Sequence, residues 1–354
     1  MIPAVGPILT LWEWLARHWA AVAMSVTMLS LIIFVVLVTA KYVRLCLNLF
    51  VDTPPPLPMV PPDFQPLSGE EGRFRSFDGT SLRGMRLPCA NPFNYKGTVV
   101  FCHGFGSDMF SCARYARPLI QAGFEVFTFD FRGHGDSSSG GTKYRPLQWP
   151  SDKEMEDVLG ACAYVESVLA SEGKETRIGL FGISRGAGAG ILAAASDPNI
   201  GAIVCDGVFS TDTTLISYMK RWAHIFARVK LVYENHPELF WKGLVWLVIR
   251  FAQPKQGCGF PSVRRALKEM RPRAILFIHG RRDRYIDETE PRLLYEAAPP
   301  PKYLWLVPQA KHNQSVAVEP KQYAARTIAF FRKHLAGEDL DESQITSPAD
   351  IEVA

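Results

Sequence analysis

Residues 178–190 read Ile-Gly-Leu-Phe-Gly-Ile-Ser-Arg-Gly-Ala-Gly-Ala-Gly, and this stretch decides the fold. An apolar run leads to Gly182, and small residues after Ser184 open a helical pattern. A serine between two such glycines fits a sharp turn from a buried strand into a helix. The turn pushes the hydroxyl outward, beside the free N–H groups of the helix N-terminus. Such a place suits a nucleophile, and the alternative is a glycine-rich turn with an exposed serine.

Length, charge and cysteine content bound the possible functions. The 354 residues are enough for one large domain with additional segments, and a scattered net charge of +4 argues against a nucleic-acid partner. The seven cysteines are odd in number and show no metal-ligand spacing, so we expect buried free thiols, no metal, and a reducing compartment. They are Cys46, Cys89, Cys102, Cys112, Cys162, Cys205 and Cys258.

An uncharged apolar run occupies residues 21–40 and matches the thickness of a bilayer core. Tryptophans before it and Tyr42 after it suit the membrane–water interface. The alternative is a cleaved signal peptide that ends at residues 38–40, but the leading region is long and barely basic. We therefore predict an N-terminal flank at 1–20 and a single-pass membrane anchor at 21–40.

The charges beside this run bear on its orientation. Lys41 and Arg44 follow the run, whereas Glu13 offsets Arg17 before it. The positive-inside rule therefore favours a cytoplasmic location for the chain that follows the run.

Seven prolines lie within residues 52–67, where helix and central strand are excluded. The predicted linker, 41–69, is either a polyproline II spacer or a coil that packs along the domain surface.

Short apolar strands alternate with amphipathic helices across the predicted domain at 70–338, beginning with a hairpin around Asp78-Gly79. This alternation predicts an α/β fold with a mostly parallel sheet covered on both faces. The acidic tail at 339–354 is predicted to be frayed. The strands are predicted at 97–102, 124–130, 178–183, 202–205, 274–279 and 303–307, and the helices at 110–122, 153–170, 185–195, 290–298 and 321–334.

An insertion at 210–272 carries three helical patterns, at 218–232, 239–252 and 263–270. The middle one is strongly apolar but too short to span a bilayer, and it is interrupted by Lys242 and Arg250. We predict a lid over the strand ends that could line an acyl pocket, with an ordinary core helix as the alternative.

A serine nucleophile needs a base and a third group that orients the base. His312 follows the last strand and is the predicted base, unless it is a solvent-exposed loop histidine. Asp283 follows the strand at 274–279 and is the predicted acid, with Asp287 as runner-up. The alternative for Asp283 is a turn-stabilising aspartate.

The developing oxyanion needs preorganised N–H donors. We assign one to the N–H of Arg185, directly after the nucleophile. The other is the N–H of Phe105 in the loop after the strand at 97–102, where flanking glycines allow close approach to a substrate.

Together these motifs resemble the α/β-hydrolase fold serine hydrolases over residues 72–334. The resemblance rests on His103-Gly-Phe-Gly106, Asp130-x-Arg-Gly-x-Gly-x-Ser137, Gly182-x-Ser-x-Gly186, His279-Gly-Arg-Arg-Asp283 and His312. It implies an α/β-hydrolase fold with the order serine, acid, histidine, and a structural role for residues 130–137, so that neither Asp130 nor His134 is catalytic. The anchor, spacer and helical insertion resemble membrane-tethered esterase-like or peptidase-like members.

The predicted function is hydrolysis of a carboxylic ester through an acyl-enzyme on Ser184, with no metal or organic cofactor. Alternatives are a serine peptidase, a thioesterase or acyltransferase, and a non-catalytic membrane-tethered scaffold. The expected partners are a small acyl ester or short peptide and membrane lipid through the anchor. The sequence leaves open the substrate, the oligomeric state and the role of Arg185, which could pair with lid carboxylates or an acidic substrate, or point into solvent.

Overall fold

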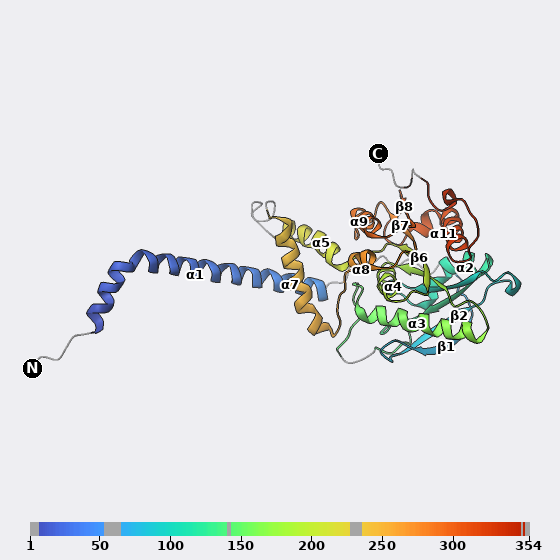
Figure 1. The fold of residues 1–354 in the computed structure, drawn as a ribbon, viewed down its shortest axis with the longest axis horizontal. Helices are drawn as coiled ribbons and strands as arrows, with labels where there is room; N and C mark the ends of the chain where they lie inside the picture. Colours follow the sequence, from blue (N-terminus) through green and yellow to red (C-terminus); the bar gives the residue numbers. More distant parts are fainter. Residues whose placement is uncertain (1–6, 53–64, 140–142, 227–235, 348–349, 351–354) are drawn as a thin grey trace, which may run out of the picture. The chain divides into compact units, whose positions relative to one another are not determined.

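The computed structural model describes residues 7–52, 65–139, 143–226, 236–347 and 350, and Figure 1 shows the chain. It divides into two compact units, Met1–Thr53 and Pro54–Ala354. Most of the predicted proline-rich spacer therefore lies outside the described residues.

The first unit is built on one long helix, α1 (Pro7–Asp52). No glycine or proline interrupts the sequence between Ile8 and Asp52, so nothing breaks the backbone ladder. The predicted flank, apolar run and start of the linker are therefore continuous in one helix instead of three segments. By length and composition α1 is able to cross a membrane.

The second unit is organised around one eight-stranded sheet, in the order β1-β2-β4-β3-β5-β6-β7-β8 within the described residues. β1 and β2 are antiparallel to their neighbours, and the strands from β4 to β8 pair in parallel. The strand that precedes Ser184 lies near the middle of the sheet. The strands are β1 (Glu70–Arg75), β2 (Ser81–Leu87), β3 (Gly97–Cys102), β4 (Phe124–Phe129), β5 (Ile178–Ile183), β6 (Ile200–Asp206), β7 (Ala274–Gly280) and β8 (Lys302–Val307).

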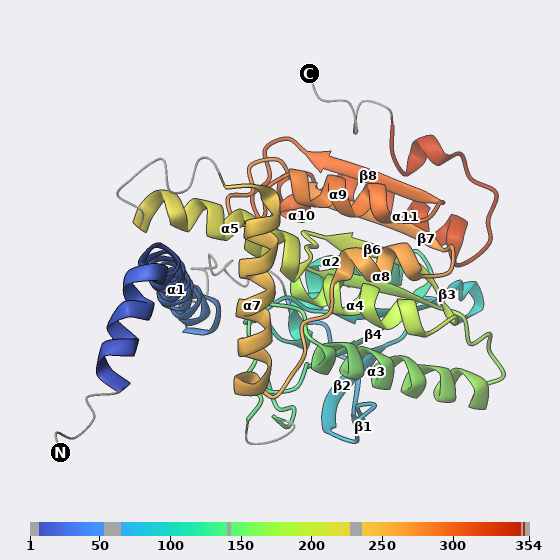
Figure 2. The ribbon, with the colours of Figure 1, turned by 60° about the vertical axis from the view of Figure 1, so that its left-hand side comes forward.

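Helices cover both faces of this sheet. On one face lie α3 (Asp152–Ser171), α4 (Arg185–Ser196), α8 (Val263–Glu269) and α9 (Thr289–Ala297), of which α3, α4 and α8 are seen in front of the strands in Figure 2. On the other face lie α2 (Ala113–Gln121) and α11 (Pro320–His334). Alternation along β5 explains the two cores, since Leu180 packs into the first core and Phe181 into the second. The predicted α/β-hydrolase architecture is confirmed.

The insertion between β6 and β7 contributes α5 (Thr211–Phe226), α7 (Glu238–Gln256) and α8. Val263 and Leu267 of α8 are fully buried in the core on the sheet, so this helix belongs to the body of the domain. Only α5 and α7 remain as lid candidates. Short helical turns complete the description: Pro92–Asn94, Met109–Cys112, α10 (Ser315–Val318) and Glu342–Gln344.

The prediction of a frayed tail is wrong for the part that the structure describes. Ile345 is fully buried, and Arg326 donates to both carboxylate oxygens of Asp350 at 2.6 and 3.2 Å. An acidic composition did not exclude packing because one buried apolar side chain and one partly buried ion pair hold the segment. The prediction for the cysteines is confirmed, since all seven are buried free thiols.

Candidate active site

Ser184 occupies a strained turn between β5 and α4. Its backbone has φ 52° and ψ −117°, a left-handed conformation that L-residues rarely adopt. Its N–H donates to the carbonyl oxygen of Asp206 at 2.7 Å, which fixes the turn to the end of β6. The predicted strand-to-helix turn is thus present, with the serine at the N-terminus of a buried helix.

The two glycines around Ser184 are required by close approach of the backbone. A Cβ on Gly182 would lie 2.3 Å from the Cα of Ala187. One on Gly186 would lie 2.4 Å from the carbonyl oxygens of Cys102 and His103. Only glycine therefore allows α4 to start so close to β3 and β5.

His312 and Asp283 meet Ser184 from two other strand ends. The Oγ of Ser184 lies 2.8 Å from His312 Nε2, and His312 Nδ1 lies 2.5 Å from Asp283 Oδ2. All three residues are buried, and only 6–9% of the surface of each residue is exposed. The structure therefore brings together the predicted nucleophile, base and acid, although they are 128 and 29 residues apart along the chain.

The surroundings of Asp283 favour its ionised form. Burial by itself would raise its pKa, but the hydrogen bond and the charge of His312 lower the pKa below the usual value. Its second oxygen accepts the N–H groups of Tyr285 and Ile286 at 2.8 and 3.0 Å. The turn-stabilising contacts and the contact with His312 thus belong to different oxygens of one carboxylate.

Asp287, the runner-up acid, lies elsewhere. Its side chain is 47% exposed, accepts the N–H of Thr289 at 3.0 Å and lies 3.6 Å from the guanidinium of Arg221. It precedes the N-cap residue of α9, and its described contacts do not include His312.

The loop after β3 lies against the turn that carries Ser184. A Cβ on Gly104 would be 3.6 Å from the carbonyl oxygen of Ile183 and 3.8 Å from the side chain of Asn313, next to the base. His103 holds the loop from inside, because its Nδ1 bonds the Gly104 carbonyl at 2.7 Å and its Nε2 accepts the N–H of Phe131 at 3.1 Å. Phe105 is thus carried on a fixed loop beside the nucleophile.

The sequence left open whether Arg185 pairs with lid carboxylates, pairs with an acidic substrate or points into solvent, and the structure buries it fully against Glu154. Its guanidinium donates to Glu154 of α3 at 3.3 Å and to the Leu147 carbonyl at 2.9 Å. It also lies 5.4 Å from the ring centroids of both Phe105 and Phe131. The cation therefore joins the nucleophile turn to the loop of Phe105.

His134 and Asp130 have structural contacts, as the resemblance implied. Asp130 accepts the N–H of Met109 at 2.8 Å, and His134 Nε2 faces the Arg185 guanidinium at 3.3 Å. Burial and the charge of Arg185 lower the pKa of His134 to about 4, so it is neutral near pH 7. A neutral ring with Nδ1–H bonded to the Arg132 carbonyl offers Nε2 as an acceptor for Arg185.

Asp206 is a residue of the site that sequence reasoning missed. Its carboxylate is fully buried and accepts the hydroxyls of Tyr323 at 3.0 Å and Ser315 at 3.3 Å. Burial raises its pKa to about 7, against those hydrogen bonds and the charge of His312. Its backbone holds Ser184, and its side chain holds the segment after His312. The available signal in the sequence was the pair Asp206-Gly207 at the end of an apolar strand.

A family model for the alpha/beta hydrolase family matches residues 99–326. The chain belongs to the alpha/beta hydrolase family. This membership, with the fold, supports a hydrolase.

The chain is also similar to known proteins in sequence and in fold. YfhR, an uncharacterized protein of Escherichia coli O157:H7, is 27% identical over 252 residues, which is 70% of this chain and 74% of that protein. The esterase Pf2001 of Pyrococcus furiosus matches with TM-score 0.57 and 22% identity, over 79% of this chain and 96% of its own. Pyrococcus horikoshii acylaminoacyl peptidase matches with TM-score 0.55 and 17% identity, over 79% of this chain and 44% of its own.

In this hydrolase, α5 is attached to the loop that carries the acid. Arg221 of α5 donates to the Arg284 carbonyl at 3.0 Å, directly after Asp283. The rings of Tyr218 and Trp149 pack together with their centroids 5.8 Å apart. Burial, and after it the charge of Asp283, raises the pKa of Tyr218 to about 12. The first helix of the insertion therefore lies close to the acid.

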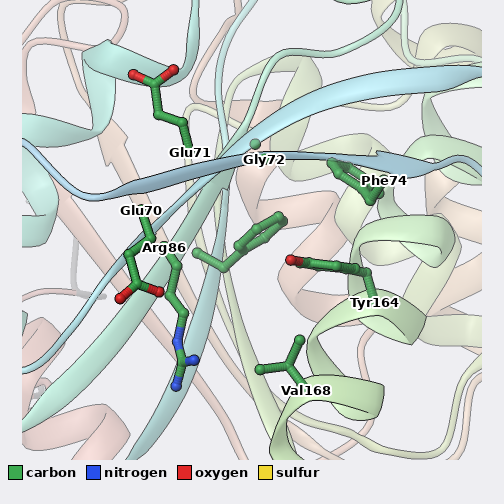
Figure 3. A pocket seen from close by; sticks show the side chains of 9 residues that line it. Glu70, Glu71, Gly72, Phe74, Arg86, Tyr164 and Val168 are labelled. Carbon is green, nitrogen blue, oxygen red and sulfur yellow. The ribbon is translucent and has the colours of Figure 1, made fainter.

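A separate pocket of about 170 Å³ lies at the other edge of the sheet, between β1, β2, β4 and α3. Figure 3 shows Phe74 and Tyr164 facing it, with Glu70 and Arg86 at its rim. None of its lining residues belongs to the Ser184 site. Within the described residues, no group of His, Cys, Asp or Glu is arranged to hold a metal ion.

Proposed function

We propose that this protein is a membrane-anchored serine hydrolase that cleaves a carboxylic ester through an acyl-enzyme. The observation that carries the proposal is the hydrogen-bonded chain from Asp283 through His312 to Ser184, with distances of 2.5 and 2.8 Å. Only a base with its lone pair directed at Oγ makes a serine hydroxyl nucleophilic near pH 7.

The proposed chemistry runs in two halves. Ser184 Oγ attacks the ester carbonyl carbon while His312 Nε2 takes its proton. The oxyanion accepts hydrogen bonds from the N–H groups of Phe105 and Arg185; as the first residue of α4, Arg185 has no acceptor for its N–H within the helix. His312 then returns the proton to the leaving alkoxide. Water repeats the sequence and releases the acid.

Asp283 serves as the group that orients the base. Its lowered pKa keeps the carboxylate charged, so it holds the proton on His312 Nδ1 and leaves Nε2 free to face Ser184. It also stabilises the imidazolium that forms during each proton transfer.

A fluorophosphonate probe tests the nucleophile. We expect the full-length protein to be labelled and Ser184→Ala to lose the label. Ser167→Ala, at an exposed serine of α3, is the matched control and keeps it. Equal labelling of Ser184→Ala and the parent would refute the assignment.

Substrate preference distinguishes an esterase from a peptidase. We expect p-nitrophenyl esters of rising chain length to be turned over faster than aminoacyl-nitroanilides, and all turnover to be lost in Ser184→Ala. Faster anilide cleavage would show a peptidase with the same nucleophile.

We also propose that α1 is a single-pass anchor, with residues 21–40 in the bilayer and the hydrolase domain on the cytoplasmic side. The support is one long apolar helix with basic residues after its apolar run. Carbonate extraction of membranes is the test, and the mass of the N-terminal peptide shows whether a signal has been cleaved. Release into the carbonate supernatant would contradict the anchor.

A further inference from the structure

Several large apolar side chains are exposed together on the insertion of the hydrolase domain. Trp246 is 65% exposed, and Leu239 of the same helix is 78% exposed. Large exposed apolar surfaces on a folded domain mark sites that contact a protein or a membrane. The exposed large apolar side chains of α5 and α7 are Ile225, Leu239, Phe240, Trp246 and Phe251.

Helix geometry places the exposed apolar side chains of α7 on the side of the helix away from its buried stripe. The residues that α7 buries, Trp241, Leu244, Val245, Val248 and Ala252, follow the spacing of one helical stripe. Leu239 and Trp246 are seven residues apart and therefore share the opposite stripe. The outward stripe is mixed, since it presents these two apolar side chains together with Lys242 and Arg250, so this helix has apolar surface left exposed after packing.

Basic residues stand beside the exposed aromatic side chain. Lys242 and Arg250 precede and follow Trp246 by four residues each, and both are exposed. Over its length α7 contains Lys242, Arg250 and Lys255 but one acidic residue, Glu238, which lies 3.6 Å from Lys242. We call Leu239, Phe240, Trp246 and Phe251, with Lys242 and Arg250, the lid face.

We propose that the lid face docks on the surface of a lipid bilayer that contains anionic headgroups. An apolar surface with tryptophan and phenylalanine, bordered by lysine and arginine, is the pattern of a helix that lies in the interfacial plane. The basic side chains complement anionic lipid.

The chain itself keeps the domain within reach of a membrane. Twelve residues, 53–64, separate the end of α1 at Asp52 from the first described residue of the domain, Gln65. Fully extended, they span at most about 40 Å. The proposal thus rests on the proposed anchor, whereas it does not depend on the proposed hydrolysis.

The test uses the full-length protein in vesicles of phosphatidylcholine with a minority of phosphatidylglycerol. Trp246→Cys is labelled with a polarity-sensitive fluorophore, and selective labelling is possible because the native thiols are buried. Phe93→Cys is the matched control, since Phe93 is fully exposed in the turn before β3, at the amino end of the sheet. The readouts are the emission shift and quenching by nitroxide-labelled lipid.

We expect a blue shift and quenching at residue 246, neither at residue 93, and weaker quenching without phosphatidylglycerol. A water-like emission at residue 246 would overturn the proposal. A blue shift without lipid quenching would also overturn it, because the face would then be covered by protein. Leu239→Cys repeats the measurement should Trp246→Cys fail to fold.

The same measurements in a Ser184→Ala background separate the two proposals. Quenching at residue 246 is expected to be unchanged there, because Ser184 is outside the lid face. Loss of lipid quenching refutes the docking surface alone, and retained fluorophosphonate labelling of Ser184→Ala refutes the proposed function alone.

Discussion

Replacing Asp283 by asparagine is the sharpest test of the proposed triad, because the change keeps the shape and removes one acceptor. Oδ1 of Asp283 accepts two backbone N–H groups, from Tyr285 and Ile286, and Oδ2 accepts from His312 Nδ1. An asparagine has one oxygen for these three donors. If that oxygen faced His312, two buried N–H groups would face an NH₂ group, at a cost of about 1–3 kcal/mol each.

The favoured orientation of the amide therefore turns its NH₂ group towards His312. Nδ1 must then present a lone pair, so the proton moves to Nε2 and faces Ser184 across 2.8 Å. The imidazole in that tautomer is not a base for the hydroxyl. We expect kcat to fall about 10⁴-fold, as for a triad with the wrong tautomer, which is about 5.5 kcal/mol at 1.36 kcal/mol per tenfold.

The assay is p-nitrophenyl ester turnover together with the rate of fluorophosphonate labelling, with circular dichroism to confirm folding. KM should change little, because the lost interaction acts in the transition state. Asp287→Asn is the control. That carboxylate is half-exposed, so the change should stay within about 0.5 kcal/mol, or about twofold in rate. Activity of Asp283→Asn within tenfold of the parent, or a greater loss in Asp287→Asn, would refute the reasoning.

Two further changes test the groups behind the triad. Arg185→Met leaves Glu154 without its cation in a buried place, and we expect a loss of about 3 kcal/mol in unfolding free energy and slower fluorophosphonate labelling as Phe105 loses its cation. In the parent protein the melting temperature is expected to fall as pH rises from about 4 to about 7, and Asp206→Asn should make this fall smaller. The raised pKa of Asp206 means that the folded state binds its proton more tightly, so the stability it contributes is present at low pH and is lost as pH rises through about 7.

Each of these has its own control. Arg250→Met removes an exposed arginine of the lid face and should leave the melting temperature nearly unchanged. Glu290 also has a pKa raised to about 7 by burial, so some pH dependence is expected to remain in Asp206→Asn. A pH profile of stability that is unchanged in Asp206→Asn would contradict the role given to Asp206. An Arg185→Met protein as stable as Arg250→Met would contradict the role given to Arg185.

Most of the fold was predictable from local pattern. The strands are apolar runs and the helices amphipathic runs, so the predicted strand at 124–130 and helix at 153–170 lie within one residue of β4 and α3 at either end. The order of motifs at strand ends then indicated which side chains would meet. The structure brings together Ser184, His312 and Asp283 because parallel strands end on one edge.

The misses concern contacts that no local pattern encodes. The partner of Arg185 is Glu154, 31 residues earlier, a glutamate that the structure also places in the capping box of α3. Asp206 was missed because an aspartate after a strand usually stabilises a turn. The packed tail was missed for a similar reason, since one buried isoleucine, Ile345, outweighs many acidic neighbours.

The left-handed backbone at Ser184 also sets a limit on how stable this protein can become. Such a conformation costs about 1–3 kcal/mol, whereas the net stability of a domain is about 5–15 kcal/mol. If Ser184 is the nucleophile, as proposed, reactivity and heat resistance compete at this one residue. Engineering for thermal tolerance has to leave this turn strained and gain free energy elsewhere, for example at Gly243, where an added Cβ meets nothing within 4 Å in an exposed part of α7.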